Sequence, residues 1–226
     1  MENRNEVWAD SSTDSPDDDL SFTSGFGNLR SAKILVERAF GPRSWIVGMQ
    51  APSRVLLYDA HEPVLSADGQ SLAFVRGDHG RGRLMVRRAF ESDTASEFAL
   101  TLSSLNVYEA SFLSARECAF SAVEHGRPPQ IYLSDAAHTN APLTLGESRY
   151  PALSPDGRWM AYSHLDQGGW NLWLRDEQTG TTRRIADVPC NQIQSAWKGD
   201  SKTLPYSTDR GRSLWFTAVS RRKVIP

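Results

Sequence analysis

Pairs of charged, aromatic and amide side chains recur along the chain and could contact one ligand together. Their members are His61 and Glu62, Tyr108 and Glu109, Arg149 and Tyr150, and Gln192 with Gln194. Tyrosine and arginine are enriched at the hot spots of protein interfaces. Two carboxylates such as Glu62 and Glu109 could also act as the acid and base of a glycosidase. These residue types therefore permit a partner-binding surface or, as an alternative, a glycoside-cleaving site.

Other kinds of active site lack their sequence signatures. The chain has no Gly-x-Ser-x-Gly nucleophile elbow, so it is not a complete serine peptidase of the α/β-hydrolase type. It has no phosphate-binding loop, and its five histidines show no metal-ligand spacing. Its two cysteines, Cys118 and Cys190, are too few for a four-cysteine zinc site or a disulfide framework. We therefore expect a non-enzyme with no catalytic residue, no metal and no cofactor.

Charge and hydropathy limit the kinds of partner and the cellular compartment that we expect for the protein. The 226 residues carry a formal net charge of −2, and their one dense basic cluster is Arg221-Arg222-Lys223. Nucleic acid is therefore not the expected partner. No apolar stretch reaches the roughly 18 residues of a membrane span, and no signal peptide is apparent. We expect no membrane insertion and a cytoplasmic protein, or a periplasmic one if the chain belongs to a longer exported protein.

The elements that must position the paired residues follow from an internal repeat. The pattern Pro-x-x-Ser-x-Asp-Gly occurs at 63–69 and at 151–157, each time followed by a short apolar run. The aromatic residues of the equivalent apolar runs, Phe74, Phe120, Tyr162 and Tyr206, are 46, 42 and 44 residues apart. Short β-prone runs joined by turns at this period are typical of the four-stranded blades of a propeller. The turns between first and second strands are expected at Asp68-Gly69 and Asp156-Gly157.

The repeat predicts an all-β protein, a β-propeller of four-stranded antiparallel blades. In the fourth repeat the strands are expected at about 150–154, 158–163, 170–175 and 181–186. A compressed blade before residue 63 raises the expected number of blades to five, with six as the alternative. Residues 21–226 would form this domain, and residues 1–20 an acidic segment or linker with seven acids and one base. Residues 6–9 could add a strand that closes the last blade.

The repeated motif resembles the TolB-type, WD-repeat-like propeller repeat. The resemblance covers about residues 55–220; it is specific at 63–75 and 151–163, and loose in the other two repeats. The third repeat lacks the Asp-Gly turn, and the last has Lys198-Gly199-Asp200 at that place. Repeats of this type occur in periplasmic envelope proteins, in the gating propellers of prolyl-oligopeptidase-like peptidases and in sensor domains. The resemblance therefore implies the fold strongly and the function weakly.

The positions of the paired residues in such a fold predict their role. Connections from the last strand of one blade to the first strand of the next gather at one mouth of the channel. All four pairs are expected just before a first strand, so they would form a ring at that mouth. In TolB-like proteins a partner peptide docks at this kind of channel mouth.

We therefore expect a non-catalytic propeller that binds a protein or peptide partner, as a sensor or as a scaffold of an envelope complex. The alternative is the propeller domain of a prolyl-oligopeptidase-like peptidase, separated from its catalytic domain. A glycoside-binding or glycoside-cleaving five-bladed protein ranks third.

Overall fold

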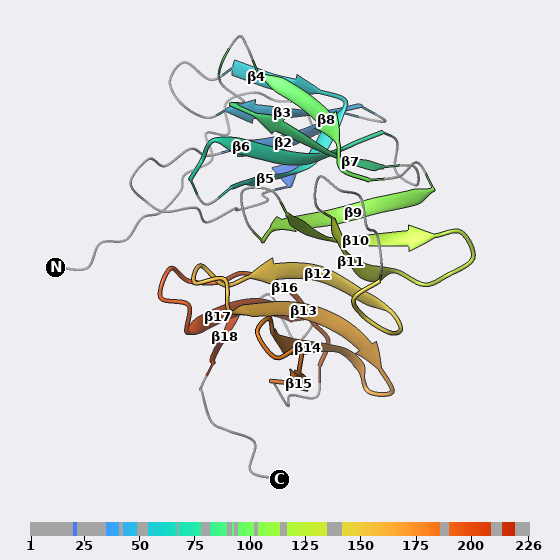
Figure 1. Cartoon of the computed structure of the whole chain (residues 1–226), viewed down its shortest axis with the longest axis vertical. Coiled ribbons are helices and arrows are strands. Elements are labelled where there is room, and N and C mark those ends of the chain that lie inside the picture. The colour runs from blue at the N-terminus through green and yellow to red at the C-terminus, as the bar shows by residue number, and fades with distance from the viewer. Residues whose placement is uncertain are drawn as a thin grey trace, which may run out of the picture.

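The computed structural model of the chain is built from antiparallel β-strands (Figure 1). It describes residues 20–21, 35–40, 43–48, 54–66, 68–77, 82–89, 92, 95–101, 104–113, 117–134, 142–185, 190–208 and 214–219. These residues form five sheets and no helix. Accordingly, no helix in the described ranges could cross a membrane.

The first two sheets each have four strands in chain order. The first sheet consists of β1 (Leu20–Ser21), β2 (Leu35–Phe40), β3 (Arg43–Gly48) and β4 (Arg54–Tyr58). The second sheet consists of β5 (Ala60–Leu65), β6 (Ser71–Arg76), β7 (Arg83–Arg88) and β8 (Ser96–Ala99). The compressed first blade expected from the sequence is thus present.

The remaining three sheets follow the same order. The third consists of β9 (Leu105–Phe112), β10 (Cys118–Glu124) and β11 (Gln130–Ser134), and a bridge joins Tyr132 to Pro142. The fourth consists of β12 (Ser148–Leu153), β13 (Trp159–Asp166), β14 (Gly169–Asp176) and β15 (Thr182–Arg184). The fifth consists of β16 (Gln192–Ser195), β17 (Thr203–Thr208) and β18 (Leu214–Ala218). Five sheets agree with the expected five blades, whereas the closing strand at 6–9 lies outside the described residues.

The Ser-x-Asp-Gly repeat forms the turn that joins the first two strands of a blade. The Asp156 carboxylate accepts hydrogen bonds from the Ser154 hydroxyl (2.6 Å) and the Arg158 amide (3.1 Å), and Gly157 has a φ of 70°. The turn at Asp68-Gly69 has the same bonds, from Ser66 (2.6 Å) and Gln70 (3.0 Å). The repeat therefore has a structural reason, because aspartate closes the turn and glycine adopts positive φ without a Cβ clash.

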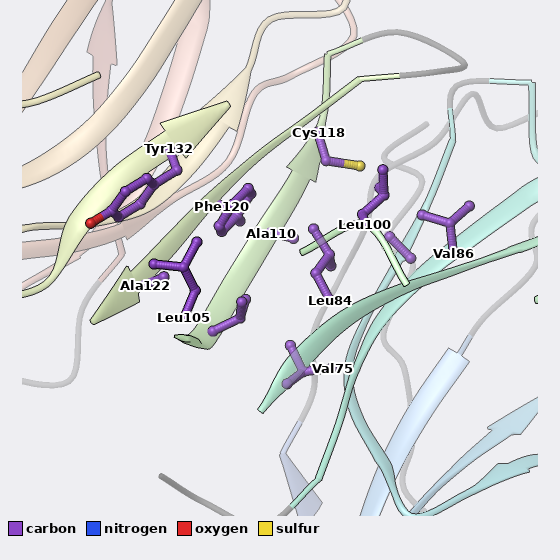
Figure 2. Close-up of a cluster of buried hydrophobic side chains, with 12 residues drawn as sticks. Val75, Leu84, Val86, Leu100, Leu105, Ala110, Cys118, Phe120, Ala122 and Tyr132 are labelled. Carbon is purple, nitrogen blue, oxygen red and sulfur yellow. The ribbon is translucent and has the colours of Figure 1, made fainter. Parts of the chain in front are cut away.

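Separate clusters of buried apolar side chains join each sheet to the next. Figure 2 shows the cluster between the second and third sheets, where Val75, Leu84 and Val86 face Phe120 and the rest of its strand. The Phe120 ring stacks on Tyr132, with ring centroids 5.7 Å apart. Three further clusters join the first sheet to the second, the third to the fourth and the fourth to the fifth.

The sheets follow one another as an arc. The first sheet lies near the upper end of the long axis in Figure 1, and the fifth lies in the lower half beside the fourth. Among the described side chains, no hydrophobic cluster joins the first sheet to the fifth. The first strands β5, β9, β12 and β16 pack against one another in sequence order along this arc. Residues on these four strands are therefore brought together across sheet boundaries.

Candidate binding site

The paired residues singled out in the sequence lie inside the first strands of the sheets and not in the loops before them. His61 and Glu62 are in β5, Tyr108 and Glu109 in β9, Arg149 and Tyr150 in β12, and Gln192 and Gln194 in β16. The expectation that they precede the strands was wrong by a few residues. Because these strands pack against one another, residues from neighbouring sheets can still lie together on one surface.

Each of the four strands is interrupted by a β-bulge at these residues. The register with the second strand shifts between His61 and Val64, between Arg149 and Ala152, and between Ile193 and Ser195. In β9 the shift leaves Tyr108 without a Cα partner on β10. A bulge bends its strand and changes the direction of a side chain, and bulges are common next to functional sites.

Three of the bulges hold a residue other than glycine at positive φ. The φ values are 52° for Glu62, 58° for Tyr150 and 51° for Gln194. This conformation is uncommon outside glycine, and each such residue costs about 1 kcal/mol or more. Strained backbone of this kind clusters at active sites and ligand clamps. Its repetition at the same place in three blades marks the inner strands as the candidate site.

Arg149 is the centre of a compact cluster between the third and fourth sheets. Its guanidinium carbon lies 4.9 Å from the Tyr108 ring centroid and 4.8 Å from the Tyr150 ring centroid. Its Nη2 forms an ion pair with Glu109. A cation over an aromatic face is attracted by the ring quadrupole. Two tyrosines thus flank one guanidinium, which a buried carboxylate holds in place.

Glu109 is held by two donors. Only 9% of the residue is exposed, and its second carboxylate oxygen accepts a hydrogen bond from the fully buried hydroxyl of Ser121. The same carboxylate is the ion-pair partner of Arg149. A carboxylate bound in this way positions the guanidinium, because both of its oxygens are already occupied. This arrangement favours a structural and orienting role for Glu109 over that of a glycosidase acid.

The electrostatics of the cluster keep the Arg149 guanidinium protonated and the Tyr150 hydroxyl un-ionised. Burial alone would lower the pKa of the Arg149 guanidinium, but the charge and hydrogen bond of Glu109 raise it. Burial raises the pKa of the Tyr150 hydroxyl, Arg149 lowers it, and the negative charges of Glu109 and Glu62 raise it further. At neutral pH the site therefore presents a charged guanidinium beside an un-ionised phenol. The charge of Glu62 is close enough to influence the pKa of Tyr150, so a residue of the second sheet also contributes to the electrostatics of the cluster.

The remaining paired residues lie elsewhere. His61 is 7% exposed and Gln192 is fully buried, whereas Gln194 is exposed. The Gln192 side-chain oxygen accepts a hydrogen bond from the Leu172 amide at 3.1 Å, so Gln192 fixes the start of the fifth sheet to the third strand of the fourth. A fully buried side chain offers nothing to a ligand at the surface. The ring expected from the sequence is thus a cluster of Tyr108, Glu109, Arg149 and Tyr150, with Glu62 nearby.

The contact made by Gln192 recurs in two other blades, and sequence reasoning missed it. The Thr101 hydroxyl accepts from the Leu84 amide (3.1 Å), and the Thr144 hydroxyl accepts from the Ile131 amide (3.0 Å). Each acceptor precedes or begins a first strand and binds the third strand of the blade before it. These buried side chains fix the spacing between blades and therefore the spacing of the site residues. The three acceptors lie 17, 13 and 20 residues after the amides that they bind, a spacing too variable to identify them from the sequence.

The side chains that could bind a metal ion are dispersed in the part of the chain that the structure describes. No group of three or more His, Cys, Asp or Glu side chains gathers there as a metal site would require. The chemistry available in the cluster is therefore that of aromatic faces, one guanidinium and carboxylates, which suits the recognition of a ligand.

Comparison with known proteins supports the fold. No protein-family model matches the chain, and no curated protein matches it. Its structure is similar to TolB from Acinetobacter baumannii, with 17% identity and a TM-score of 0.63 over 77% of this chain and 45% of that one. It is also similar to a putative TolB from Agrobacterium tumefaciens, with 15% identity and a TM-score of 0.62 over 77% of this chain and 65% of that one.

A peptidase gives a match of the same quality. A puromycin-hydrolysing peptidase of Mycobacterium tuberculosis has 16% identity and a TM-score of 0.66 over 84% of this chain and 34% of the peptidase. The chain thus spans less than two thirds of each of these three structures. At this level of identity the likeness concerns the fold alone. Together with the five antiparallel sheets, it shows that the chain has the all-β architecture of a β-propeller.

Proposed function

We propose that this protein is a non-catalytic β-propeller that binds a protein or peptide partner through the cluster of Tyr108, Glu109, Arg149 and Tyr150. One observation carries the proposal: three inner strands hold strained bulges at equivalent places, and one of them presents Tyr150 beside Arg149. Glycine would adopt these φ values without strain, so the side chains at these positions carry a cost that a binding role would explain. Tyrosine and arginine are the residue types on which interface binding energy concentrates.

The geometry supports a binding role in a second way. Arg149 is already fixed by Glu109, so its orientation is set before a partner arrives. A preorganised side chain loses little conformational entropy on binding, and this raises affinity. The compartment remains a proposal: a cytoplasmic sensor or a periplasmic complex both agree with the fold, and cell fractionation with an antibody would distinguish them.

The test replaces Tyr150 by glycine. Tyr150→Gly removes the ring and relieves the strain at a φ of 58°, which offsets part of the stability lost with the ring's contact to Arg149; a melting curve establishes that the variant is folded. Ala89→Gly is the matched control, because Ala89 is exposed, has a φ of 46° and lies in the turn after β7. Partners captured from the native host with the wild-type protein are then titrated against both variants. At least tenfold weaker binding by Tyr150→Gly alone supports the proposal, and equal affinities for all three proteins refute it.

A second candidate is the propeller domain of a peptidase. The likeness to the mycobacterial peptidase and to a puromycin hydrolase (21% identity, TM-score 0.59) favours it. Under this alternative the partner would be an α/β-hydrolase domain, and co-expression with such a domain encoded alongside this chain would restore peptide hydrolysis. If Tyr150→Gly loses binding to a separate partner and no hydrolase domain is encoded nearby, the result favours the binding proposal over the peptidase alternative.

A further inference from the structure

Exposed apolar side chains gather at the β13–β14 hairpin of the fourth sheet, outside the cluster of Tyr108, Glu109, Arg149 and Tyr150 (the Tyr108–Tyr150 cluster). Among the residues whose side chains are described, three large hydrophobic residues are exposed: Tyr58 (69%), Leu145 (88%) and Leu165 (38%). Two of these three belong to the fourth sheet and the segment leading into it. Exposed apolar side chains scattered singly need no explanation, whereas a gathered set marks an interaction site.

The backbone brings these residues to the same place. The Leu165 amide donates a hydrogen bond to the Glu147 carbonyl (2.9 Å), so the end of β13 lies beside the segment that carries Leu145. Leu165 is paired with Trp170 across the β13–β14 hairpin, and cross-strand partners lie on the same face of a sheet. Trp170 is itself partly exposed. Leu165 and Trp170 thus share one face at the tip of the fourth sheet, and Leu145 lies two residues from the backbone that contacts Leu165; these three residues are called the apolar row.

Two carboxylates border the apolar row. Glu147 supplies the carbonyl that the Leu165 amide binds, and Asp166 follows Leu165 in the chain. Both residues are partly exposed. Within the described residues neither of them takes part in an ion pair. By contrast, Glu124 at the end of β10 is paired with Arg127. The Asp166 carboxylate accepts hydrogen bonds from the Gly168 amide (2.9 Å) and the Asn171 side chain (2.8 Å), which fix it on the hairpin. Within the part of the chain that the structure describes, the edge of the row therefore carries two carboxylates that no ion pair balances.

The row lies at the same end of the fourth sheet as the Tyr108–Tyr150 cluster. Strand β12 begins at this end, and the β13–β14 hairpin turns there, because Ser148 is paired with His164. The cluster occupies the inner strand β12, whereas the row occupies the β13–β14 tip. A partner at the channel mouth could reach both surfaces, yet each one has its own residues and its own chemistry.

We propose that the row of Leu145, Leu165 and Trp170 is a docking surface for a basic amphipathic segment of a protein partner. An apolar side chain of that segment would cover the two leucines, and a neighbouring lysine or arginine would approach Glu147 and Asp166. Charge complementarity selects this partner, because an acidic segment would bring like charges together. This inference goes beyond the proposed function and does not depend on the Tyr108–Tyr150 cluster.

The experiment uses a defined probe on the full chain. The probe is a fluorescein-labelled twelve-residue peptide in which leucine pairs alternate with lysine pairs, and its counterpart has glutamate in place of lysine. Fluorescence anisotropy should show binding of the lysine peptide that weakens as salt rises, and at least tenfold weaker binding of the glutamate peptide. Leu145→Ser with Leu165→Ser should weaken the lysine peptide at least tenfold, and Glu147→Gln with Asp166→Asn at least threefold.

Tyr58→Ser is the matched control, because the exposure of Tyr58 (69%) lies between those of Leu165 and Leu145 and the residue belongs to the first sheet. It should leave the affinity for the lysine peptide unchanged. Circular dichroism and melting curves establish that each variant is folded. The proposal is overturned if the lysine peptide does not bind, if the two peptides bind equally, or if Tyr58→Ser weakens binding as much as the leucine substitutions do.

Discussion

Gly82 is predicted to be the least replaceable glycine between the second and third sheets. It is buried just before β7, and its carbonyl accepts a hydrogen bond from the Val107 amide at 2.8 Å. Its own amide donates to the Asn106 side chain at 2.6 Å. A Cβ at this position would lie 2.5 Å from a Val75 methyl and 2.7 Å from the Val107 carbonyl oxygen. The methyl could turn away, but the carbonyl is part of the backbone of β9.

The cost of Gly82→Ala follows from these contacts. Forcing one methyl into a packed interface typically costs 1–3 kcal/mol, so about that much is expected here. The displaced backbone would also weaken the hydrogen bond to Val107, worth about 1 kcal/mol. The free energy of unfolding should therefore fall by about 2–4 kcal/mol. For a chain of this length, that lowers the melting temperature by roughly 4–16 °C.

Gly199→Ala is the matched control for this substitution. A Cβ at Gly199 would meet no atom within 4 Å, and its φ is not in the range that excludes side chains. Alanine there should leave stability unchanged or raise it by about 0.4–1 kcal/mol, because it restricts the unfolded chain. Urea denaturation of the three proteins measures both effects. Equal stability of Gly82→Ala and Gly199→Ala would refute the close approach of the two sheets at Gly82.

Three more predictions concern charge and thiol reactivity. Arg149→Ala should cost about 2–4 kcal/mol in urea denaturation, because it leaves the Glu109 carboxylate buried without its cation, and adding Glu109→Gln should restore part of that loss. Burial raises the pKa of the Asp156 carboxyl, but hydrogen bonds from Ser154 and Arg158 lower it more, so its folded pKa is depressed. The stability that the Asp156 carboxylate contributes is present above its unfolded pKa of about 4 and is lost as pH falls through the lower folded value. Asp156→Asn should therefore flatten the acid side of the profile of stability against pH. An unchanged profile would contradict this. Burial raises the pKa of the Cys118 thiol to about 12, so a disulfide reagent at pH 8 should modify Cys190 quickly and Cys118 only after unfolding; rapid modification of both thiols would count against a buried Cys118.

The sequence was sufficient to predict the blades because their turns are local. Ser154, Asp156 and Gly157 form their bonds within a few residues of one another, so the pattern alone identifies the turn. The fifth sheet shows where this reasoning ends. Ser201 adopts a φ of 53° there, and its amide bonds to the Lys198 carbonyl as Gly157 bonds to Ser154. Serine at such a position gives no turn signal, so the last repeat looked degenerate although its turn is preserved.

The candidate site was predictable in its residue types and less so in its geometry. The recurrence of aromatic and charged pairs before the repeated motif singled out Tyr108, Glu109, Arg149 and Tyr150. Their position within the strands depends on bulges, whose mark in the sequence is the proline at 63 and 151 that begins the repeated motif. Gln192 was assigned to the same surface, but it is turned inward to bind a backbone amide of the neighbouring sheet. Only the packing of one blade on the next decides between these two orientations.

The clusters of apolar side chains between consecutive sheets couple the local opening of one sheet to its neighbours. In the described residues each sheet is joined to the next along the chain, as the units of a linear repeat array are. The second, third and fourth sheets are each held on both sides by such clusters. Local opening of any of these three sheets therefore exposes two apolar interfaces at once, which makes it costly. Tyr108 and Arg149 lie on the third and fourth sheets, so the binding cluster is expected to keep its shape when less tightly held parts of the chain open.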